Sequence, residues 1–208
     1  WHVYSSDLGT TDRQDDFRAD ITLPSGWYAV NEGDYDYSTY GFDRGHMCPS
    51  ADRTSSIPNN SATFLMTNMI PQAPNNNQGP WMKLEDYARS LVNSGSELYI
   101  ICGPYGQGGK SAKGTFSTLA SGVTVPSYTW KIIVVIPNGN DDLNRISSTT
   151  RVIAVWMPNN QTVSSQSWGY YRKSVDYIES QTGYNFLSNV STTIQSTIEA
   201  KVDTGATS

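Results

Sequence analysis

The tetrapeptide Asp43-Arg44-Gly45-His46 combines side chains that could act together on a phosphate ester. His46 is one of only 2 histidines in the chain, and imidazole titrates near neutral pH, so it could take a proton from water. Arg44 offers a permanent positive charge with forked donors that match phosphate oxygens. Gly45 leaves space for close approach of a substrate or of a second backbone segment. These residue types are suited to phosphodiester hydrolysis.

Amide side chains follow further along the chain in the run Asn75-Asn76-Asn77-Gln78. Amide and carboxylate oxygens are ligands for a hard cation such as Mg²⁺, which keeps several of its waters. Each residue also has an ordinary explanation when taken alone. Asn is common in turns, Glu85 could face solvent, and Arg13 among neighbouring aspartates could form a surface ion pair. A lone His beside Asp is also more often structural than catalytic, so only the combination indicates a site.

The elements that must position these side chains are those of a single α+β domain. Helical spacing of apolar residues predicts a helix that starts at Pro80 and stops at Gly95. Two shorter helices are expected near the end of the chain, at 174–183 and 191–202. Apolar runs predict strands at 27–30, 63–69, 98–102, 128–136 and 151–157.

We therefore expect a central, mostly antiparallel sheet with flanking helices. The domain is expected to cover 1–203, with a flexible tail at 204–208 because those residues have little to bury.

The charge balance of 14 basic against 19 acidic residues excludes a protein that coats nucleic acid with its whole surface. It leaves room for an enzyme whose positive charge is local. Charged residues make up only 16%, and a polar, lysine-poor composition is typical of exported proteins, so we expect a secreted or periplasmic location. No run approaches the ~20 apolar residues of a membrane span, so we expect no membrane partner. The chain opens at Trp1 without Met, which favours a processed product whose first strand is trimmed.

The 2 cysteines, Cys48 and Cys102, allow three interpretations. They could form one disulfide, which an oxidising compartment would favour. They could instead be two buried free thiols, since free Cys packs as a small hydrophobe. A zinc site with His46 is the third interpretation, although the spacing matches no common zinc motif.

Several motifs taken together resemble the DNA/RNA non-specific endonucleases, which are ββα-metal nucleases. The resemblance covers nearly the whole chain, to about Val202, and is more specific than any one short pattern. The main motifs are Asp43-Arg44-Gly45-His46-x-x-Pro49, Thr67-Asn68-Met69-x-Pro71-Gln72 and Asn76-Asn77-Gln78-x-x-Trp81-x-x-Leu84-Glu85. Supporting matches are Asp12-Arg13-Gln14-Asp15, Leu23-Pro24-x-Gly26-Trp27, Gly103-Pro104 and Leu187-Ser188-Asn189-Val190.

The resemblance implies a role for each matched position. His46 would be the general base, Asn77 the one direct protein ligand to Mg²⁺, and Glu85 the holder of a metal-bound water. Arg13 and Arg44 would contact the phosphate. Asn68 would be a polar residue of the same pocket, and Asp43 would brace Arg44 or its loop. Mn²⁺ or another divalent cation could replace Mg²⁺.

The implied function is a secreted, Mg²⁺-dependent, sugar-non-specific endonuclease. Its partners would be DNA and RNA, held through their backbone phosphates, with a protein inhibitor as a further partner and the oligomeric state left open. Contacts restricted to phosphate read no base, so sequence selectivity would be weak. The resemblance also implies 5′-phosphate and 3′-hydroxyl ends.

Three alternatives remain at this point. The first is a metal-dependent phosphodiesterase that acts on non-polymeric substrates. The second is a non-catalytic nucleic-acid-binding module. The third is a structural zinc protein that uses His46, Cys48 and Cys102.

Overall fold

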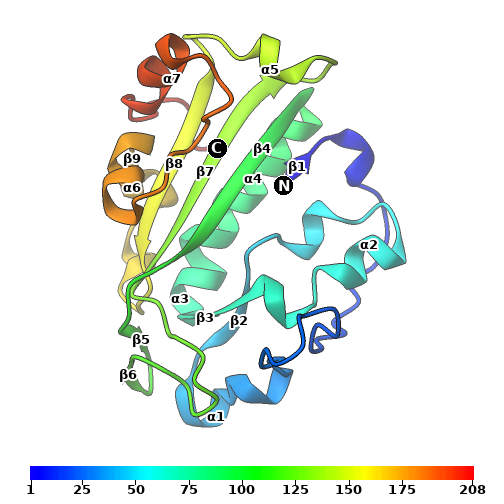
Figure 1. Cartoon of the computed structure of the whole chain (residues 1–208), viewed down its shortest axis with the longest axis vertical. Helices are drawn as coiled ribbons and strands as arrows, with labels where there is room; N and C mark the ends of the chain where they lie inside the picture. The colour runs from blue at the N-terminus through cyan, green and yellow to red at the C-terminus, as the bar shows by residue number, and fades with distance from the viewer.

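A five-stranded antiparallel sheet forms the centre of the protein, as a computed structural model of residues 1–208 shows (Figure 1). The strands lie in the order β1-β4-β7-β8-β9. Their bounds are His2–Val3 for β1, Ser96–Tyr105 for β4, Tyr128–Pro137 for β7, Arg151–Pro158 for β8 and Arg172–Lys173 for β9. The three long strands confirm the runs predicted at 98–102, 128–136 and 151–157, and each is longer than predicted.

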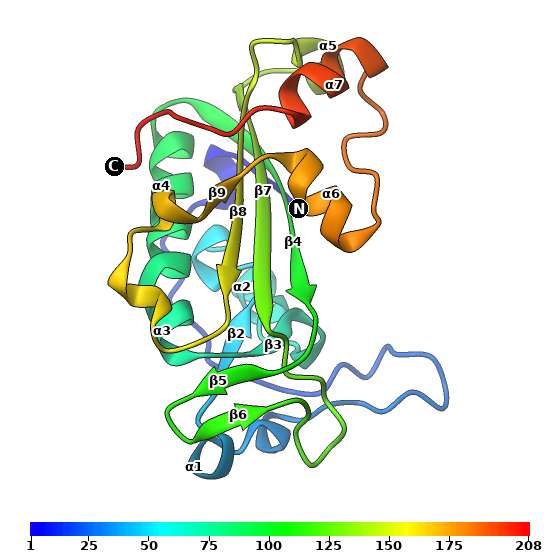
Figure 2. The ribbon, with the colours of Figure 1, turned by 90° about the vertical axis from the view of Figure 1, so that its left-hand side faces the viewer.

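Helices cover both faces of this sheet, as Figures 1 and 2 show. On one face, α4 (Met82–Asn93) packs its Leu84 and Val92 against Ile133 of β7. On the other face, Ile178 of α6 (Val175–Thr182) and Ile198 of α7 (Thr192–Glu199) belong to a second cluster. Because both faces of β7 and β8 are buried, these strands are mostly apolar and do not alternate regularly with polar residues.

The three predicted helices are confirmed, and the start of α4 differs from the prediction. The chain enters α4 through α3 (Pro74–Asn76) and a wide π-turn at Asn77–Trp81. Gly79 has non-helical backbone angles inside that turn, and Pro80 follows it. Gly95 has φ +95°, which few other residues adopt, and the helix ends before it.

A separate two-stranded unit pairs β2 (Asp43–His46) with β3 (Met69–Gln72) in antiparallel register. A Cβ at Gly45 would lie 2.2 Å from Gln72 Oε1, so glycine is required for this close approach. With α4 following β3, the segment has a strand–strand–helix order. The fold class predicted from the sequence, an α+β ββα-metal nuclease fold with a mostly antiparallel sheet and flanking helices, is confirmed.

Two predicted strands are wrong. The run at 63–69 contains a 3₁₀ turn, η4 (Met66–Asn68), and the strand begins only at Met69. The run at 27–30 pairs with nothing, and Trp27 and Tyr28 are 69% and 60% exposed. Aromatic residues in this run favoured a strand by propensity, but a strand needs a partner to satisfy its backbone.

The remaining elements are short. A small hairpin of β5 (Gly109–Ser111) and β6 (Gly114–Phe116) follows β4. Short helices lie at Ser5–Asp7 (η1), Glu32–Tyr35 (η2), Tyr37–Tyr40 (α1), Ser50–Asp52 (η3), Ile57–Ala62 (α2), Asp142–Arg145 (α5), Val163–Ser165 (η6) and Trp168–Tyr171 (η7).

The last residues, expected to form a flexible tail, lie against β8 and η7. Arg151 donates to the Ala206 carbonyl at 2.8 Å, and the Trp168 indole donates to the Thr207 carbonyl at 3.1 Å. None of the helices is both long and apolar enough to span a membrane.

Candidate active site

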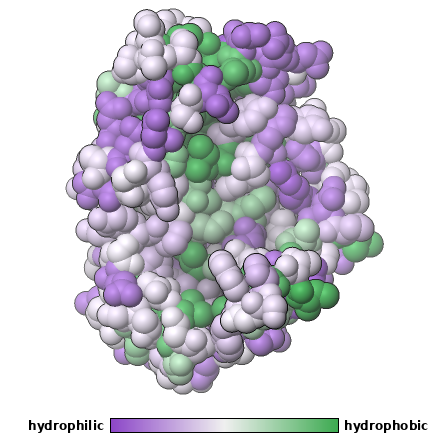
Figure 3. Space-filling view, viewed as in Figure 1, coloured by the Kyte–Doolittle hydropathy of each residue, from purple (hydrophilic) through white to green (hydrophobic).

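A polar cleft of about 630 Å³ lies beside β2 and α1, at the lower end of the molecule in Figure 1. Its lining includes three of the predicted site residues, Arg13, Arg44 and Asn77, together with Asp43. These residues come from well-separated parts of the chain. Viewed from the same side, the surface is hollowed along its middle, where hydrophobic residues show between more hydrophilic margins (Figure 3).

Aromatic rings hold both arginines in place. The Arg13 guanidinium lies 4.8 Å from the centre of the Phe64 ring, and its Nη1 donates to Ser50 Oγ at 2.9 Å. The Arg44 guanidinium lies 4.1 Å from the centre of the Phe17 ring. A ring contacts only the face of a guanidinium, and each of the two arginines keeps at least one edge nitrogen without a hydrogen bond, so both groups can bind an anion in the cleft.

Asp43 braces the amide side chains, not Arg44. Its Oδ2 accepts from Asn77 Nδ2 at 2.9 Å and from Gln78 Nε2 at 2.8 Å. The first of these bonds fixes the Asn77 amide and leaves Oδ1 without a hydrogen bond. Asn76, by contrast, is fully buried and donates to Thr129 Oγ1 at 3.0 Å. The Oδ1 atoms of both amides lack a hydrogen bond, but only Asn77 lines the cleft, so Asn77 is the amide whose oxygen suits a hard cation there.

His46 lies at the end of β2 between two phenylalanine rings. Its ring centre is 5.0 Å from that of Phe64 and 5.7 Å from that of Phe17, both edge to face. Burial, and then the charge of Arg13, lower the pKa of His46 to about 4. The imidazole is thus neutral at neutral pH, as a general base must be. Its Nε2 is buried without a hydrogen-bond partner.

Asn68, which the resemblance assigns to the phosphate pocket, does not line the cleft. Its amide accepts from Cys48 N at 3.0 Å and donates to the Cys48 and Thr63 carbonyls at 2.8 and 2.9 Å. All these partners are backbone groups. Asn68 therefore holds the segment that follows His46.

Glu85 is not part of the cleft lining. Its Oε1 accepts from Lys131 Nζ at 2.9 Å, and the side chains are 11% and 1% exposed. Burial raises the pKa of Glu85, and the Lys131 ammonium opposes that rise. Glu85 Oε2 makes no hydrogen bond with another protein group.

Lys131 is the main residue that sequence reasoning missed. It stands within the apolar run of β7, and its Nζ lies 4.1 Å from the centre of the Trp81 ring. The signal was available, because a lysine inside a buried strand requires a charged partner. A neighbouring ion pair, Arg89 with Asp52 at 3.0 Å, joins α4 to η3.

Cys48 and Cys102 are both free, so the disulfide, one of the three interpretations of these residues, is not formed in the structure. Cys102 Sγ lies 3.6 Å from the Met47 carbonyl and 3.7 Å from Met47 Sδ. Burial raises the pKa of each thiol to about 12, which keeps both protonated. The structure therefore fits the interpretation of two free thiols. The ligand atoms of His46, Cys48 and Cys102 are not grouped closely enough to hold one zinc ion. The two sets of closely grouped ligand atoms in the fold are His2, Glu97 and Asp142, and Asp176, Glu179 and Glu199.

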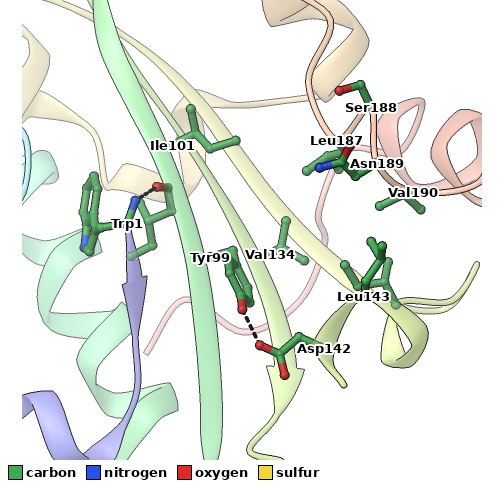
Figure 4. Close-up of a pocket in the computed structure, with 12 residues that line it drawn as sticks. Trp1, Tyr99, Ile101, Val134, Asp142, Leu143, Leu187, Ser188, Asn189 and Val190 are labelled. Carbon is green, nitrogen blue, oxygen red and sulfur yellow. Dashed lines mark hydrogen bonds between the residues drawn. The ribbon is translucent and has the colours of Figure 1, made fainter. Parts of the chain in front are cut away.

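A second pocket, of about 400 Å³, is apolar and lies toward the opposite end of the molecule (Figure 4). Leu143, Leu187 and Val190 line it, and Tyr99 donates a hydrogen bond to Asp142 at its margin. It contains no basic side chain, so it does not have the chemistry of a phosphate site.

The β2–β3–α4 unit carries His46 on its first strand and Asn77 at the entry to its helix, which defines the class of ββα-metal nucleases. The sequence profile of the DNA/RNA non-specific endonucleases matches residues 1–193. The chain belongs to the DNA/RNA non-specific endonuclease family, and the predicted family and enzyme class, a metal-dependent endonuclease, are confirmed.

The chain is similar to a nuclease of Nostoc sp. (strain PCC 7120 / SAG 25.82 / UTEX 2576), with 53% identity over 98% of this chain and 70% of the relative. It is 30% identical to human mitochondrial endonuclease G over 88% of this chain and 60% of that protein. A solved chain from a study of the EndoG/EndoGI complex and the mechanism of EndoG inhibition has a TM-score of 0.74 at 23% identity. That match covers 91% of this chain and 77% of the solved one. This last likeness concerns the fold.

Proposed function

We propose that this endonuclease is Mg²⁺-dependent and cuts both DNA and RNA without selecting the sugar. The observation that carries the proposal is the cleft itself. It gathers two ring-stacked arginines and a free amide oxygen beside a neutral, buried histidine. In this proposal the arginines bind backbone phosphate and the amide oxygen binds the cation. Neither contact distinguishes one base from another, so sequence selectivity would be weak.

The donor set fits a hard divalent cation. Asn77 would hold it directly through Oδ1, and Glu85 would act through a bound water at Oε2. When bound, the cation supplies charge neutralisation and polarisation at the phosphate. The use of Mn²⁺ or another divalent cation in place of Mg²⁺ is part of the same proposal.

The protein's own side chains account for the other parts of the reaction. Arg13 and Arg44 would hold the phosphate oxygens and stabilise the charge that develops on them. His46 would accept a proton from the attacking water, because its imidazole is neutral and lies beside the arginines. Asn68 would keep the segment after His46 in place through its bonds to Cys48 and Thr63.

The proposal also includes secretion or a periplasmic location, supported by the lysine-poor, polar composition. It includes a protein inhibitor as a partner class, supported by the inhibitor complex in which the EndoG fold relative was solved. Export is tested by fractionating the source cells.

The decisive experiment is incubation of the protein with plasmid DNA and with RNA, with Mg²⁺ or with a chelator. We expect both polymers to be degraded without a discrete fragment pattern, and the chelator to stop the reaction. His46→Ala serves as the matched control for a contaminating nuclease. Cleavage of a small phosphodiester with both polymers left intact would instead support the non-polymeric alternative.

A further inference from the structure

Carboxylates already occupy both cleft arginines. Arg13 Nε donates to Asp15 Oδ1 at 2.6 Å, and Arg44 Nη1 donates to Glu32 Oε2 at 3.1 Å. All four side chains line the same cleft. A phosphodiester carries one negative charge over two free oxygens, as a carboxylate does, so it would compete with these carboxylates for pairing with the two guanidinium groups.

We propose that Asp15 and Glu32 set the affinity of the cleft for the nucleic-acid backbone by competing with phosphate for Arg13 and Arg44. The inference rests on the proposed function and names residues that control its substrate binding. Neither carboxylate is proposed to take part in the chemical step.

The other acidic groups of the cleft have different partners. Asp36 accepts hydrogen bonds from Ser38 and Thr39 at the start of α1, and Asp43 accepts from the amides of Asn77 and Gln78. Only Asp15 and Glu32 among the lining carboxylates pair with arginine.

Release of the carboxylates would not disorder the arginines. Arg13 would keep its contacts with Phe64 and Ser50, and Arg44 would keep its contact with Phe17. The pairs are also easy to break, because their side chains are exposed, at 50% and 60% for Arg13 and Asp15 and 36% and 59% for Arg44 and Glu32. The arginines are thus held in position while the carboxylates are exchangeable.

The backbone conformation at Asp15 determines which substitution can test the proposal. Asp15 has φ +50°, in the left-handed region that non-glycine residues seldom adopt. Aspartate and asparagine tolerate this region better than most residues. Asp15→Asn therefore removes the charge and keeps the turn, which makes it the appropriate test substitution.

The test measures binding of a short fluorescein-labelled single-stranded DNA by anisotropy, at low ionic strength and with a chelator so that no cleavage occurs. We expect Glu32→Gln and Asp15→Asn each to tighten binding about two- to fivefold, the range set by exposed ion pairs. Asp12→Asn is the matched control, because it removes the same charge from a side chain that pairs with neither arginine. Its effect should be smaller than either.

A double-mutant cycle separates competition from general electrostatics. Glu32→Gln should have no effect in an Arg44→Gln background, and Asp15→Asn none in an Arg13→Gln background. Equal tightening with and without the arginine, or no tightening in the wild-type background, would overturn the inference. Cleavage of DNA and RNA by the wild-type protein is measured in a separate assay. A negative result in the binding assay would therefore leave the endonuclease proposal intact.

Discussion

Lys131 Nζ and Glu85 Oε1 lie 2.9 Å apart between β7 and α4, in a place that water hardly reaches. The ammonium is the only charged group bonded to Glu85, and the carboxylate is the only one bonded to Lys131. The pair joins the helix that follows Asn77 to the central sheet. Each charged group loses its hydration on burial, and the ion pair is the interaction that compensates for this loss.

Replacing Lys131 with Met should therefore destabilise the fold. The substitution keeps the packing of the aliphatic chain but leaves Glu85 buried without its partner, and we expect a loss of about 3–5 kcal/mol. Urea unfolding measures it. Lys83→Met is the control, because Lys83 is exposed on α4, the helix that carries Glu85. It should change stability by less than about 0.5 kcal/mol. A similar loss in both variants would show that the ion pair is not the cause. Adding Glu85→Gln to Lys131→Met should recover part of the loss.

Replacing His46 with Ala should lower the turnover number by about 10²–10⁴, the usual contribution of a general base. The fold should persist at neutral pH, because no hydrogen bond to the imidazole is lost. Single-turnover cleavage of a labelled duplex measures the chemical step. Turnover near that of the wild type would exclude His46 as the base.

The same residue should make stability depend on pH. The pKa of His46 is about 4 in the folded protein, below the ordinary value of 6.5, so the unfolded chain binds the proton more tightly. Its contribution is present above pH 6.5 and is lost as pH falls toward 4, by up to about 3 kcal/mol. Urea unfolding of the wild type and His46→Ala at both ends of this window tests the sign. The stability difference between them should shift in favour of the variant at low pH, and a constant difference would contradict the buried, neutral imidazole.

Asn77→Ala should abolish Mg²⁺ binding at working concentrations, because Asn77 Oδ1 is the proposed direct ligand. Gln78→Ala is the matched control, since Gln78 shares the bond to Asp43 but is exposed. Calorimetric titration of Mg²⁺ into each protein separates ligand loss from effects on catalysis. Equal Mg²⁺ affinity in Asn77→Ala and wild type would place the ion elsewhere.

Glu199 should make the protein less stable at high pH. Burial, and then the charge of Glu179, raise the pKa of Glu199 to about 7 from its ordinary 4.5. The stability that this group contributes is present below pH 4.5 and is lost as pH rises through 7. Glu199→Gln should therefore be more stable than the wild type at pH ~8, by about 1 kcal/mol after allowance for solvent screening, and similar at pH ~4. Thermal unfolding at the two pH values checks this, and parallel profiles for the two proteins would refute it.

The sequence by itself determined the class of fold, and it predicted which residues form the candidate site. The long apolar strands and the helix that ends before Gly95 could be predicted from local composition and periodicity. These patterns involve only residues that are close together in the sequence. The spacing of His46, Asn77 and Glu85 likewise lies within one continuous strand–strand–helix segment. Gly45 was identified as a point of close approach, and its contact with Gln72 confirms this.

Only the tertiary structure decided which groups meet. Asn76 and Asn77 are neighbours of the same type, yet one is buried against Thr129 and the other opens to the cleft. Asn68, immediately before β3, donates from its amide to the carbonyl of Cys48, 20 positions away in the sequence. The partners of Arg44 and Glu85 are Glu32 and Lys131, which are far from them in sequence. Such pairings depend on where segments that are remote in the sequence pack against one another. Residue type and spacing along the chain do not determine which remote side chains come into contact.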